Sequence, residues 1–333
     1  MIDGTSSEPK ELKTGFPQGS VLGPYMYPLY TSELFEIAQK HGINIHMYAD
    51  DIQLYIVCDP AHRHETLKIL ETAINEIRQW MIANHLKLND SKTEFMVMRK
   101  PSLRKNIEDI TSICIGDTAV NAVNQAKNIG ATLDTEMTMT GHIKNTIKSC
   151  YSQIRQIFHI RACISQSATE TLVNSLVTSR LDYVNALLYG VSNDKLRKLQ
   201  SVQHSAACLI FKKKKSEHVT PLLRSLHWLP VEHRINYKIN LLTFKAIHGE
   251  APLYLQELVQ PYQPARHLRS TTQGQLTRKD TAKTGKRTGG RAFSVSAVLL
   301  WNNLSPNVKT QVKLEGFKKA LKTFYFEKCF SKA

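Results

Sequence analysis

Apolar side chains recur every three or four residues along two stretches of the chain. In residues 64–84 this repeat predicts a helix with one buried stripe, made of Leu67, Leu70, Ile74, Ile77 and Met81. From about residue 140 the same period predicts another helix, whose apolar face carries Ile143, Ile147, Tyr151, Ile154 and Phe158. An amphipathic helix is also predicted to end at Gly42, and further helices at 166–180, 192–211, 231–248, 291–303 and 313–327.

Short runs rich in Ile, Val and Tyr predict strands in the first part of the chain. INIHMY and IQLYIVC flank Ala49-Asp50-Asp51, which predicts a β-hairpin with an acidic turn. KLNDSKTEFMVM predicts a turn followed by a strand, and SICIGDTAV and NIGATLD predict shorter strands. Mixed elements of this kind indicate an α+β fold with an antiparallel sheet, followed by a helical region.

Composition excludes several classes of protein. Of the 333 residues, 42% are hydrophobic and 22% are charged, which excludes a chain that is disordered throughout. No apolar run approaches the ~18 residues of a membrane span, and the N-terminus lacks an apolar signal core, so an intracellular location is expected. The six cysteines form no CxxC pair, which predicts free, mostly buried thiols and neither a zinc site nor a disulfide framework.

Charge divides the chain into two dissimilar halves. Residues 1–150 contain 15 basic and 18 acidic side chains, whereas residues 151–333 contain 29 basic and 10 acidic ones. A basic half of this kind favours a polyanion as partner, although a solvated basic surface is the alternative.

The residues Tyr48-Ala49-Asp50-Asp51 are the strongest candidate for chemistry. Adjacent carboxylates repel each other, and a divalent metal such as Mg²⁺ is well suited to hold them together. Asp-Asp alone is also a common solvated turn. The loop GFPQGSVLGP stands about thirty residues upstream, and its small residues let a backbone approach a nucleotide closely.

Together these motifs resemble those of LINE-type reverse transcriptases, the enzymes of non-LTR retrotransposons, and in particular the jockey-like group. GFPQGSVLGP (15–24) resembles motif B of this family, YADD (48–51) motif C, and residues 86–98 motif D. The resemblance continues through RLDYVNALLYG, HVTPLLRSLHWLPVEHRI and GGRAFSVSAVLLWNNLSP, and it runs from about residue 12 to residue 328. It implies an incomplete antiparallel palm at 1–138, a helical thumb at 139–250 and a basic C-terminal region at 251–333.

The resemblance also implies roles for single residues. Asp50 and Asp51 match metal ligands for Mg²⁺ or Mn²⁺, and Tyr48 matches a residue beside the primer end. Gln18 and Gly19 match positions that border the template base and the incoming nucleotide, and Lys92 matches a lysine that faces the triphosphate. The implied partners are an RNA template, a DNA primer and deoxynucleoside triphosphates. His142 and Trp80 match common family residues and are interpreted as packing.

One departure from the family pattern concerns motif A, which supplies a further metal-binding aspartate upstream of motif B. Fourteen residues precede Gly15, and their Asp3 stands in a polar run without an apolar strand. We therefore expect this chain to lack motif A and the fingers, and to polymerise poorly or not at all alone.

Two basic clusters complete the candidate residues. The first is the run Lys212, Lys213, Lys214 and Lys215, which predicts either a phosphate-binding or nuclear-localisation patch, or cations that complement a helix C-terminus. The second lacks interleaved aromatic residues, which suits contacts to phosphates, and includes Arg266, Arg269, Lys286, Arg287 and Arg291. Three hypotheses remain open: part of a polymerase, a catalytically dead module that binds RNA or an RNA–DNA hybrid, and a decayed fragment without a role.

Overall fold

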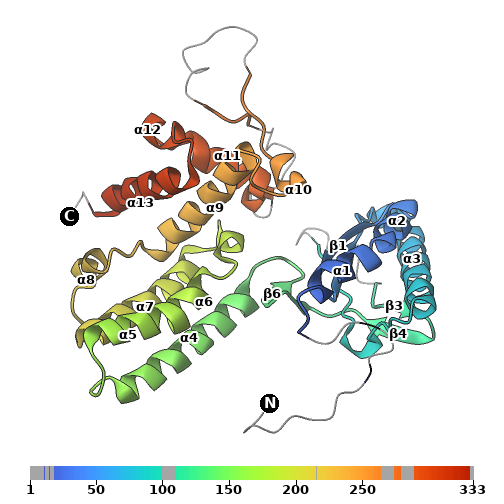
Figure 1. Cartoon of the computed structure of the whole chain (residues 1–333), viewed down its shortest axis with the longest axis horizontal. Coiled ribbons are helices and arrows are strands. Elements are labelled where there is room, and N and C mark those ends of the chain that lie inside the picture. The colour runs from blue at the N-terminus through green and yellow to red at the C-terminus, as the bar shows by residue number, and fades with distance from the viewer. Residues whose placement is uncertain are drawn as a thin grey trace. The chain divides into compact units, whose positions relative to one another are not determined.

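The computed structural model describes residues 11, 15, 19–99, 110–214, 216–263, 274–278 and 289–330. The chain divides into two compact units, Met1–Ile129 (unit 1) and Gly130–Ala333 (unit 2), and each is described by itself (Figure 1). Unit 1 mixes helices with antiparallel strand pairs, and the described part of unit 2 is mostly helical. This confirms the predicted α+β class, whereas the assignment of palm and thumb remains a prediction.

Unit 1 is built around one long helix. Its helices are α1 (Gly23–Tyr30), α2 (Glu33–Lys40) and α3 (Arg63–Ala83), and its 3₁₀ turns are η1 (Pro60–His62) and η2 (Asp90–Lys92). Its strands are β1 (Asn44–Tyr48), β2 (Asp51–Tyr55), β3 (Ser112–Ile115), β4 (Thr118–Asn121) and β5 (Gln125–Asn128). β1 pairs with β2 and β3 with β4, both antiparallel as the sequence predicts.

The apolar stripe of α3 forms the centre of unit 1. The side chains of Leu70, Ile74, Ile77 and Met81 are buried, and Leu67 packs at the edge of the same cluster, which confirms the predicted stripe. Burying each such side chain contributes about 1.5–3 kcal/mol. The buried residues form two clusters along α3. One includes Ile113 and Ile115 of β3, the other includes Leu34 of α2, and Leu54 of the β1–β2 hairpin packs against both.

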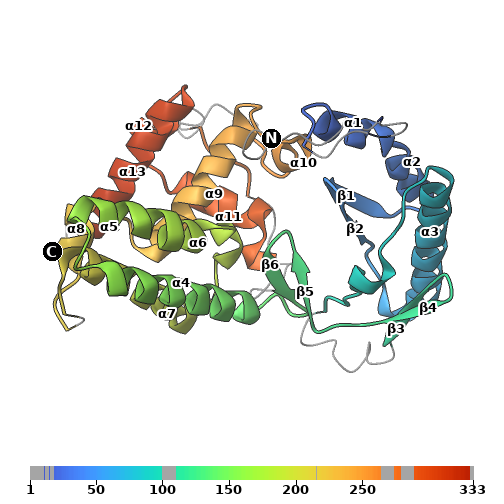
Figure 2. The same ribbon diagram turned by 60° about the horizontal axis from the view of Figure 1, so that its bottom comes forward.

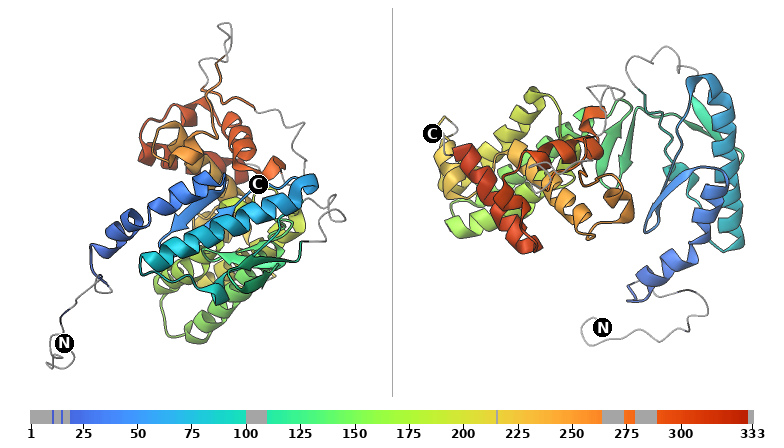
Figure 3. Two further views of the ribbon diagram at one scale, coloured as in Figure 1. Left: turned by 90° about the vertical axis from the view of Figure 1, so that its right-hand side faces the viewer. Right: turned by 90° about the horizontal axis from the view of Figure 1, so that it is seen from above.

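Helix α3 therefore stabilises the hairpin that carries the acidic turn. A two-stranded hairpin is marginally stable by itself in water. The inward side chains Ile45, Met47, Ile52 and Leu54 alternate with exposed ones, and all four pack against the buried residues of α2 and α3. Figure 3 shows α3 lying along one side of this hairpin.

The predicted helix that ends at Gly42 is in fact two helices. Gly42 adopts a φ of +67° after α2, as expected for a residue that ends a helix. The prediction of a single helix is wrong because the chain breaks at Thr31 and Ser32. The hydroxyl of Thr31 donates to the carbonyl of Tyr27, and that of Ser32 to the carbonyl of Leu29. Such side-chain bonds compete with the helical backbone pattern.

The strand predicted after Lys92 is reduced to a single bridge. Phe95 pairs with Ala122 in an isolated parallel bridge, and its carbonyl accepts a bond from the backbone N–H of Val123 at 2.8 Å. The side chain of Phe95 packs on the cluster around Ile113. Packing of this one side chain, rather than a ladder of backbone bonds, holds the segment against α3 and β3.

Unit 2 begins with β6 (Ala131–Asp134) and α4 (Thr140–Ile160). Its longer helices include α7 (Asn193–Phe211), α9 (Val231–Ile247), α11 (Phe293–Asn302) and α13 (Leu314–Phe330). The shorter helical elements are α5 (Gln166–Val173), a π-helical turn (Asn174–Thr178), α6 (Ser179–Asp182), η5 (Asn185–Leu188), α8 (Thr220–Ser225), α10 (Leu253–Gln256), η8 (Gly289–Arg291) and α12 (Pro306–Lys309). The helices predicted from periodicity are thus confirmed within a few residues.

The buried face of α4 differs from the predicted one. Ile143 is buried as expected, but Phe158 is 66% exposed, so its place on the buried face is wrong. Cys150 and Ile157 are buried instead. The sequence pattern assigns Phe158 to the buried face because it is apolar and continues the repeat. At 3.6 residues per turn, however, Ile157 lies on the same side of α4 as the buried residues Ile143 and Cys150.

Helices α4 and α7 lie side by side in unit 2 (Figure 2). They run in the same direction, because bonds join the two helices at both ends. Near the beginning, Lys195 of α7 donates to the carbonyl of Thr138 at 2.7 Å. Beyond the end of α4, Arg161 donates to the carbonyl of Leu209 at 3.0 Å.

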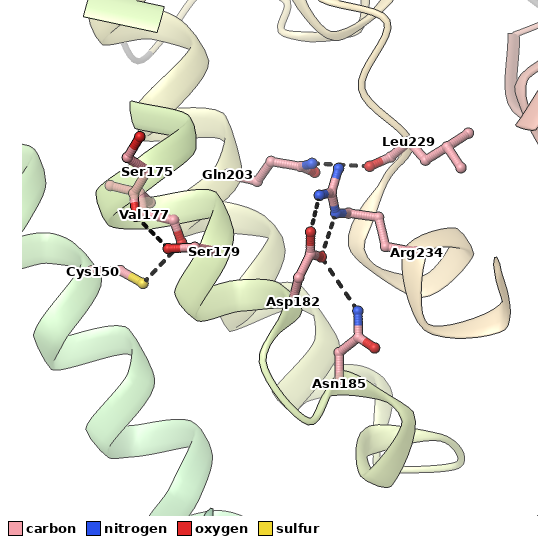
Figure 4. Close-up of polar contacts among 9 residues, drawn as sticks. All are labelled: Cys150, Ser175, Val177, Ser179, Asp182, Asn185, Gln203, Leu229 and Arg234. Atoms are coloured by element: carbon pink, nitrogen blue, oxygen red, sulfur yellow. Dashed lines mark hydrogen bonds and ion pairs between the residues drawn. The ribbon is translucent and has the colours of Figure 1, made fainter. Parts of the chain in front are cut away.

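Two separate sets of polar contacts tie α9 to α6, and the segment before α9 to α7 (Figure 4). Arg234 donates from two nitrogens to the two carboxylate oxygens of Asp182, and Asn185 donates to the same carboxylate at 3.3 Å. Gln203 of α7 donates to the carbonyl of Leu229 at 2.9 Å. Two-pronged arginine–carboxylate bonds of this kind fix orientation as well as distance.

The expectations about cysteines and membranes have mixed outcomes. All six thiols are free, as predicted, but Cys58, Cys114 and Cys163 are exposed, so the prediction of mostly buried thiols is wrong. Cys114 points away from the core because its neighbours Ile113 and Ile115 occupy the inner face of β3. Within the described residues, no helix combines the length and apolar character that crossing a bilayer requires.

One buried and one half-buried histidine of unit 2, His142 and His204, predict a dependence of stability on pH. Burial lowers the pKa values of His142 and His204 below the ordinary value of about 6.5. The unfolded chain therefore binds more protons than the folded one as the pH falls below about 6.5, and stability decreases. We expect the urea midpoint to fall between pH 7.5 and 5.5, and to fall less in His142→Gln and His204→Gln. The exposed His159→Gln is the control, and an equal pH dependence in all variants would contradict this prediction.

Candidate active site and nucleic-acid surface

The acidic turn lies at the exposed tip of the β1–β2 hairpin. The register pairs Tyr48 directly with Asp51, which leaves Ala49 and Asp50 as a two-residue turn. Tyr48, Asp50 and Asp51 are all exposed. Because side chains alternate along a strand, the apolar residues hold the hairpin on α3 while Tyr48 and Asp51 share its outer face.

Ala49 adopts a left-handed backbone conformation, with a φ of +52°. This conformation costs a residue with a Cβ about 1–2 kcal/mol. Two-residue hairpin turns require positive φ at their first position or at both, so the pairing of the strands imposes it here. Asp50, in the turn, and Asp51, the first residue of β2, therefore both lie at the tip of the hairpin.

Tyr27 is a residue near the acidic turn that sequence reasoning missed. Burial raises the pKa of its phenol, and the negative charge of Asp50 raises it further. The phenol of Tyr27 therefore lies close enough to Asp50 to respond to its charge. Nothing in the sequence PYMYPLY distinguishes Tyr27 from its neighbours Tyr25 and Tyr30, which are largely exposed.

Motif B is described only in part. Gly19 has a φ of +88°, and the space where a Cβ would stand is open. The hydroxyl of Ser20 accepts a bond from the N–H of Gly23 at 3.0 Å, at the beginning of α1. Gln18 lies outside the described residues. The open space beside the backbone of Gly19 is compatible with the predicted close approach of a nucleotide, which stays a prediction.

Lys92 is exposed on η2, and its position depends on Arg78 of α3. Arg78 forms an ion pair with Asp90 of η2 at 3.2 Å and donates to the carbonyl of Ile115 at 3.3 Å. One guanidinium thus links α3, the Lys92 turn and β3. Among the described residues, Lys92 forms no ion pair with Asp50 or Asp51, so the structure does not bring its ammonium group to the carboxylates.

Comparison with known proteins identifies the segment that contains these motifs. Residues 1–142 match the family described as reverse transcriptase (RNA-dependent DNA polymerase). This part of the chain is therefore similar to reverse transcriptases.

The relatives are LINE-type polymerases. The chain is 27% identical over 299 residues to the probable RNA-directed DNA polymerase from transposon BS of Drosophila melanogaster, an alignment that covers 85% of this chain and 30% of the relative. It is 24% identical over 211 residues to the RNA-directed DNA polymerase from mobile element jockey of Drosophila funebris, covering 60% of this chain and 22% of the relative. The chain thus spans less than a third of the length of these relatives, and no solved structure matches it.

The resemblance to LINE-type, jockey-like reverse transcriptases is therefore confirmed. A polyprotein of the type-1 element R1 from Nasonia vitripennis is also similar, at 24% identity over 227 residues, covering 66% of each chain. The alignment with the transposon BS polymerase exceeds 142 residues, so the similarity extends from the reverse transcriptase segment into unit 2.

The carboxylate oxygens at the hairpin tip are of the kind that Mg²⁺ prefers, but they supply only part of its ligands. Reverse transcriptases generally use divalent metal ions. Mg²⁺ binds through one or two carboxylates, together with waters and substrate phosphates. Asp50 and Asp51 supply two exposed carboxylates. The part of the chain that the structure describes contains no cluster of three or more His, Cys, Asp or Glu side chains that could hold a metal ion.

The Lys212–Lys214 run follows the C-terminus of α7 and is exposed. Arg161, which is 7% exposed, already donates to the last carbonyls of α7 at Leu209 and Ile210. Lys213 pairs with Glu217 at 3.1 Å, whereas Lys212 and Lys214 have no side-chain partner among the described residues. The C-terminus of α7 is therefore capped without these ammonium groups. Lys215 lies outside the described residues.

Of the second basic cluster, the structure describes Arg291 but not Arg266, Arg269, Lys286 or Arg287. The guanidinium of Arg291 donates to three backbone carbonyls, of Tyr189 at 2.8 Å, Met137 at 2.6 Å and Leu187 at 2.9 Å. Burial lowers its pKa, and Asp134 opposes that shift. Because its donors are used within the fold, we leave Arg291 out of the proposed phosphate contacts.

His142 and Trp80 have the packing roles that the sequence suggests. His142 is 6% exposed and accepts a weak bond from the N–H of Thr132 at 3.4 Å. Trp80 packs at the edge of the cluster that contains Leu34, and its indole N–H donates to Glu33 of α2.

Proposed function

We propose that this chain forms the motif-C-bearing palm and the nucleic-acid-holding helices of a LINE-type polymerase, which copies RNA into DNA. The observation that carries the proposal is the pair Asp50 and Asp51 at the exposed tip of a hairpin, within the segment that matches the reverse transcriptase family. The partners of the whole protein would be an RNA template, a DNA primer and deoxynucleoside triphosphates.

The proposed division of the chain follows the resemblance. Residues 1–138 would form part of the palm, 139–250 a thumb and 251–333 a basic C-terminal region. The compact unit that ends at Ile129 and the parallel helices α4 and α7 are compatible with this division.

In this proposal, Asp50 and Asp51 hold Mg²⁺ or Mn²⁺. When bound, the metal lowers the cost of deprotonating a primer hydroxyl and neutralises charge on the departing pyrophosphate. Tyr48 shares the outer hairpin face with Asp51, and there its ring borders the primer end. Gln18 and Gly19 border the template base and the nucleotide, and Lys92 faces the triphosphate once substrate is bound.

Replacing Asp50 with asparagine tests this proposal. We expect Mn²⁺ binding by the full chain, measured by electron paramagnetic resonance, to weaken at least about tenfold in Asp50→Asn, because one charged oxygen ligand is lost. Asp117→Asn is a matched control, since Asp117 also occupies an exposed hairpin turn of unit 1. We expect primer extension by this chain alone to be weak; whatever metal-dependent extension of a DNA primer on an RNA template it shows should be lost in Asp50→Asn and retained in Asp117→Asn.

Two results would overturn the proposal. One is equal Mn²⁺ binding by Asp50→Asn and Asp117→Asn. The other is detectable primer extension that is equal in both variants, which would indicate a contaminating polymerase.

A binding module without catalysis is the second candidate function. It is favoured by the ammonium groups of Lys212 and Lys214, which the cap of α7 does not require. This function predicts salt-sensitive binding of RNA that is equal in the unmodified chain and in Asp50→Asn, with no primer extension by either.

A further inference from the structure

Helix α4 carries basic side chains along one exposed face and contains no aspartate or glutamate. Lys144, Lys148 and Arg155 are all exposed. At 3.6 residues per turn they fall within about 40° of arc, so they form one stripe along the helix. The buried residues Ile143 and Ile157 lie on the other side, against the core of unit 2.

The cations of this stripe have no partner in the part of the chain that the structure describes. Among the described residues, Lys144, Lys148 and Arg155 form no ion pair and donate no side-chain hydrogen bond. Some bases on other helices of unit 2 are paired instead: Lys198 with Asp194 at 2.9 Å, and Lys318 with Glu315 at 2.6 Å. Like charges four residues apart on a helix are mildly destabilising. The stripe therefore adds no ion pair or side-chain hydrogen bond that would stabilise the described part of unit 2.

An exposed aromatic ring lies at the C-terminal end of the stripe. Phe158 is 66% exposed, although the rest of the apolar residues near it on α4 are buried or half-buried up to Ile157. Its ring lies 6.3 Å from that of His159, edge to face. A row of cations that ends in an open aromatic ring is the combination on which single-stranded nucleic acids bind, through phosphate contacts and base stacking.

We propose that this face of α4 binds one strand of single-stranded nucleic acid, with phosphates along Lys144, Lys148 and Arg155 and an unpaired base stacked on Phe158. The inference rests on the proposed function, which supplies an RNA template as a partner. From Lys144 to Phe158 the stripe is about 21 Å long at 1.5 Å per residue. A membrane surface is a poorer partner, because the apolar side of α4 is buried in the core and cannot enter a bilayer.

The charge part of the proposal is tested by removing the three cations together. The triple variant Lys144→Gln/Lys148→Gln/Arg155→Gln is compared with Arg197→Gln/Lys198→Gln/Lys318→Gln, which loses the same charge from bases that are paired with acids. Binding of a fluorescent 12-nucleotide RNA by the full chain is measured by anisotropy in EDTA at several salt concentrations. We expect about 10- to 100-fold weaker binding in the stripe variant, and a salt slope smaller by about 2.

The stacking part is tested with Phe158→Ala against Tyr254→Ala, which removes another exposed aromatic ring from unit 2. Loss of a stacked base weakens binding of the single strand about 5- to 100-fold. The salt slope should stay unchanged in Phe158→Ala, and binding of a blunt 12-base-pair RNA–DNA hybrid should change little.

Equal RNA affinity in each variant and its control would overturn the proposal. Displacement of the RNA by a polyglutamate peptide at equal charge concentration would also overturn it, since the face would then accept any acidic polymer. Because these measurements are made in EDTA, their failure is distinct from failure of the Mn²⁺ and extension tests at Asp50.

Discussion

Replacing Arg161 with alanine is expected to lower the free energy of unfolding of unit 2 by about 3–6 kcal/mol. The guanidinium is 7% exposed and donates to three backbone carbonyls, of Ile164 at 3.0 Å, Leu209 at 3.0 Å and Ile210 at 2.7 Å. Each buried carbonyl left without a donor costs about 1–3 kcal/mol. The loss also removes a positive charge from the C-terminus of α7, where the helix dipole favours one.

The carbonyls at the end of α7 have few alternative donors. The N–H of Lys213 already bonds to the carbonyl of Cys208 at 2.9 Å, and that of Lys212 reaches Leu209 only at 3.4 Å. Removal of Arg161 therefore leaves Ile210 without its donor, and no described neighbour replaces it. The cost should appear as a shift in the urea transition of the full chain, followed by circular dichroism.

Arg155→Ala is the matched control for this prediction. Arg155 lies on the exposed side of α4, and its guanidinium has no partner among the described residues. Arg161→Lys keeps the charge but loses the fork of donors, so its stability should fall between those of the unmodified chain and Arg161→Ala. If Arg161→Ala is as stable as Arg155→Ala, the guanidinium does not cap α7.

Local patterns predicted the parts of the fold that depend on neighbouring residues. The stripe of α3 and the β1–β2 hairpin follow from periods of 3.6 and 2 residues, and both are confirmed. The position of Asp50 and Asp51 at the tip of the hairpin also follows from the sequence, because the two apolar runs that flank them form its strands.

Contacts between distant residues could not be predicted in this way. The proximity of Tyr27 to Asp50, the link from Arg78 to Asp90 and the cap on α7 by Arg161 all join different elements. The basic residues illustrate the consequence. In sequence, Arg291 belongs to a charge run, but the fold uses its donors internally, while the free cations of α4 are too widely spaced to form a run.

The second large effect on stability is expected at Arg291. It distinguishes hydrogen bonding within unit 2 from contact with phosphates as the role of this side chain. We expect Arg291→Ala to lower the free energy of unfolding by about 2–4 kcal/mol, because the carbonyls of Leu187, Tyr189 and Met137 lose their donor. Arg278→Ala is the control, since Arg278 is an exposed arginine of the same basic run. Binding of the 12-nucleotide RNA by the folded protein should be unchanged in Arg291→Ala.

Gly190 provides an independent check on the same contact. It has a φ of +69°, and a Cβ built there would stand 2.8 Å from Cγ of Arg291. Gly190→Ala should therefore destabilise the chain both by backbone strain and by displacing Arg291. In the double variant Gly190→Ala/Arg291→Ala there is no long side chain at position 291 for the new Cβ to displace. The stability lost by the double variant should therefore be smaller than the sum of the two single losses. Full additivity would contradict the contact between Gly190 and Arg291. An Arg291→Ala variant that is as stable as Arg278→Ala but binds RNA more weakly would assign Arg291 to phosphate contact.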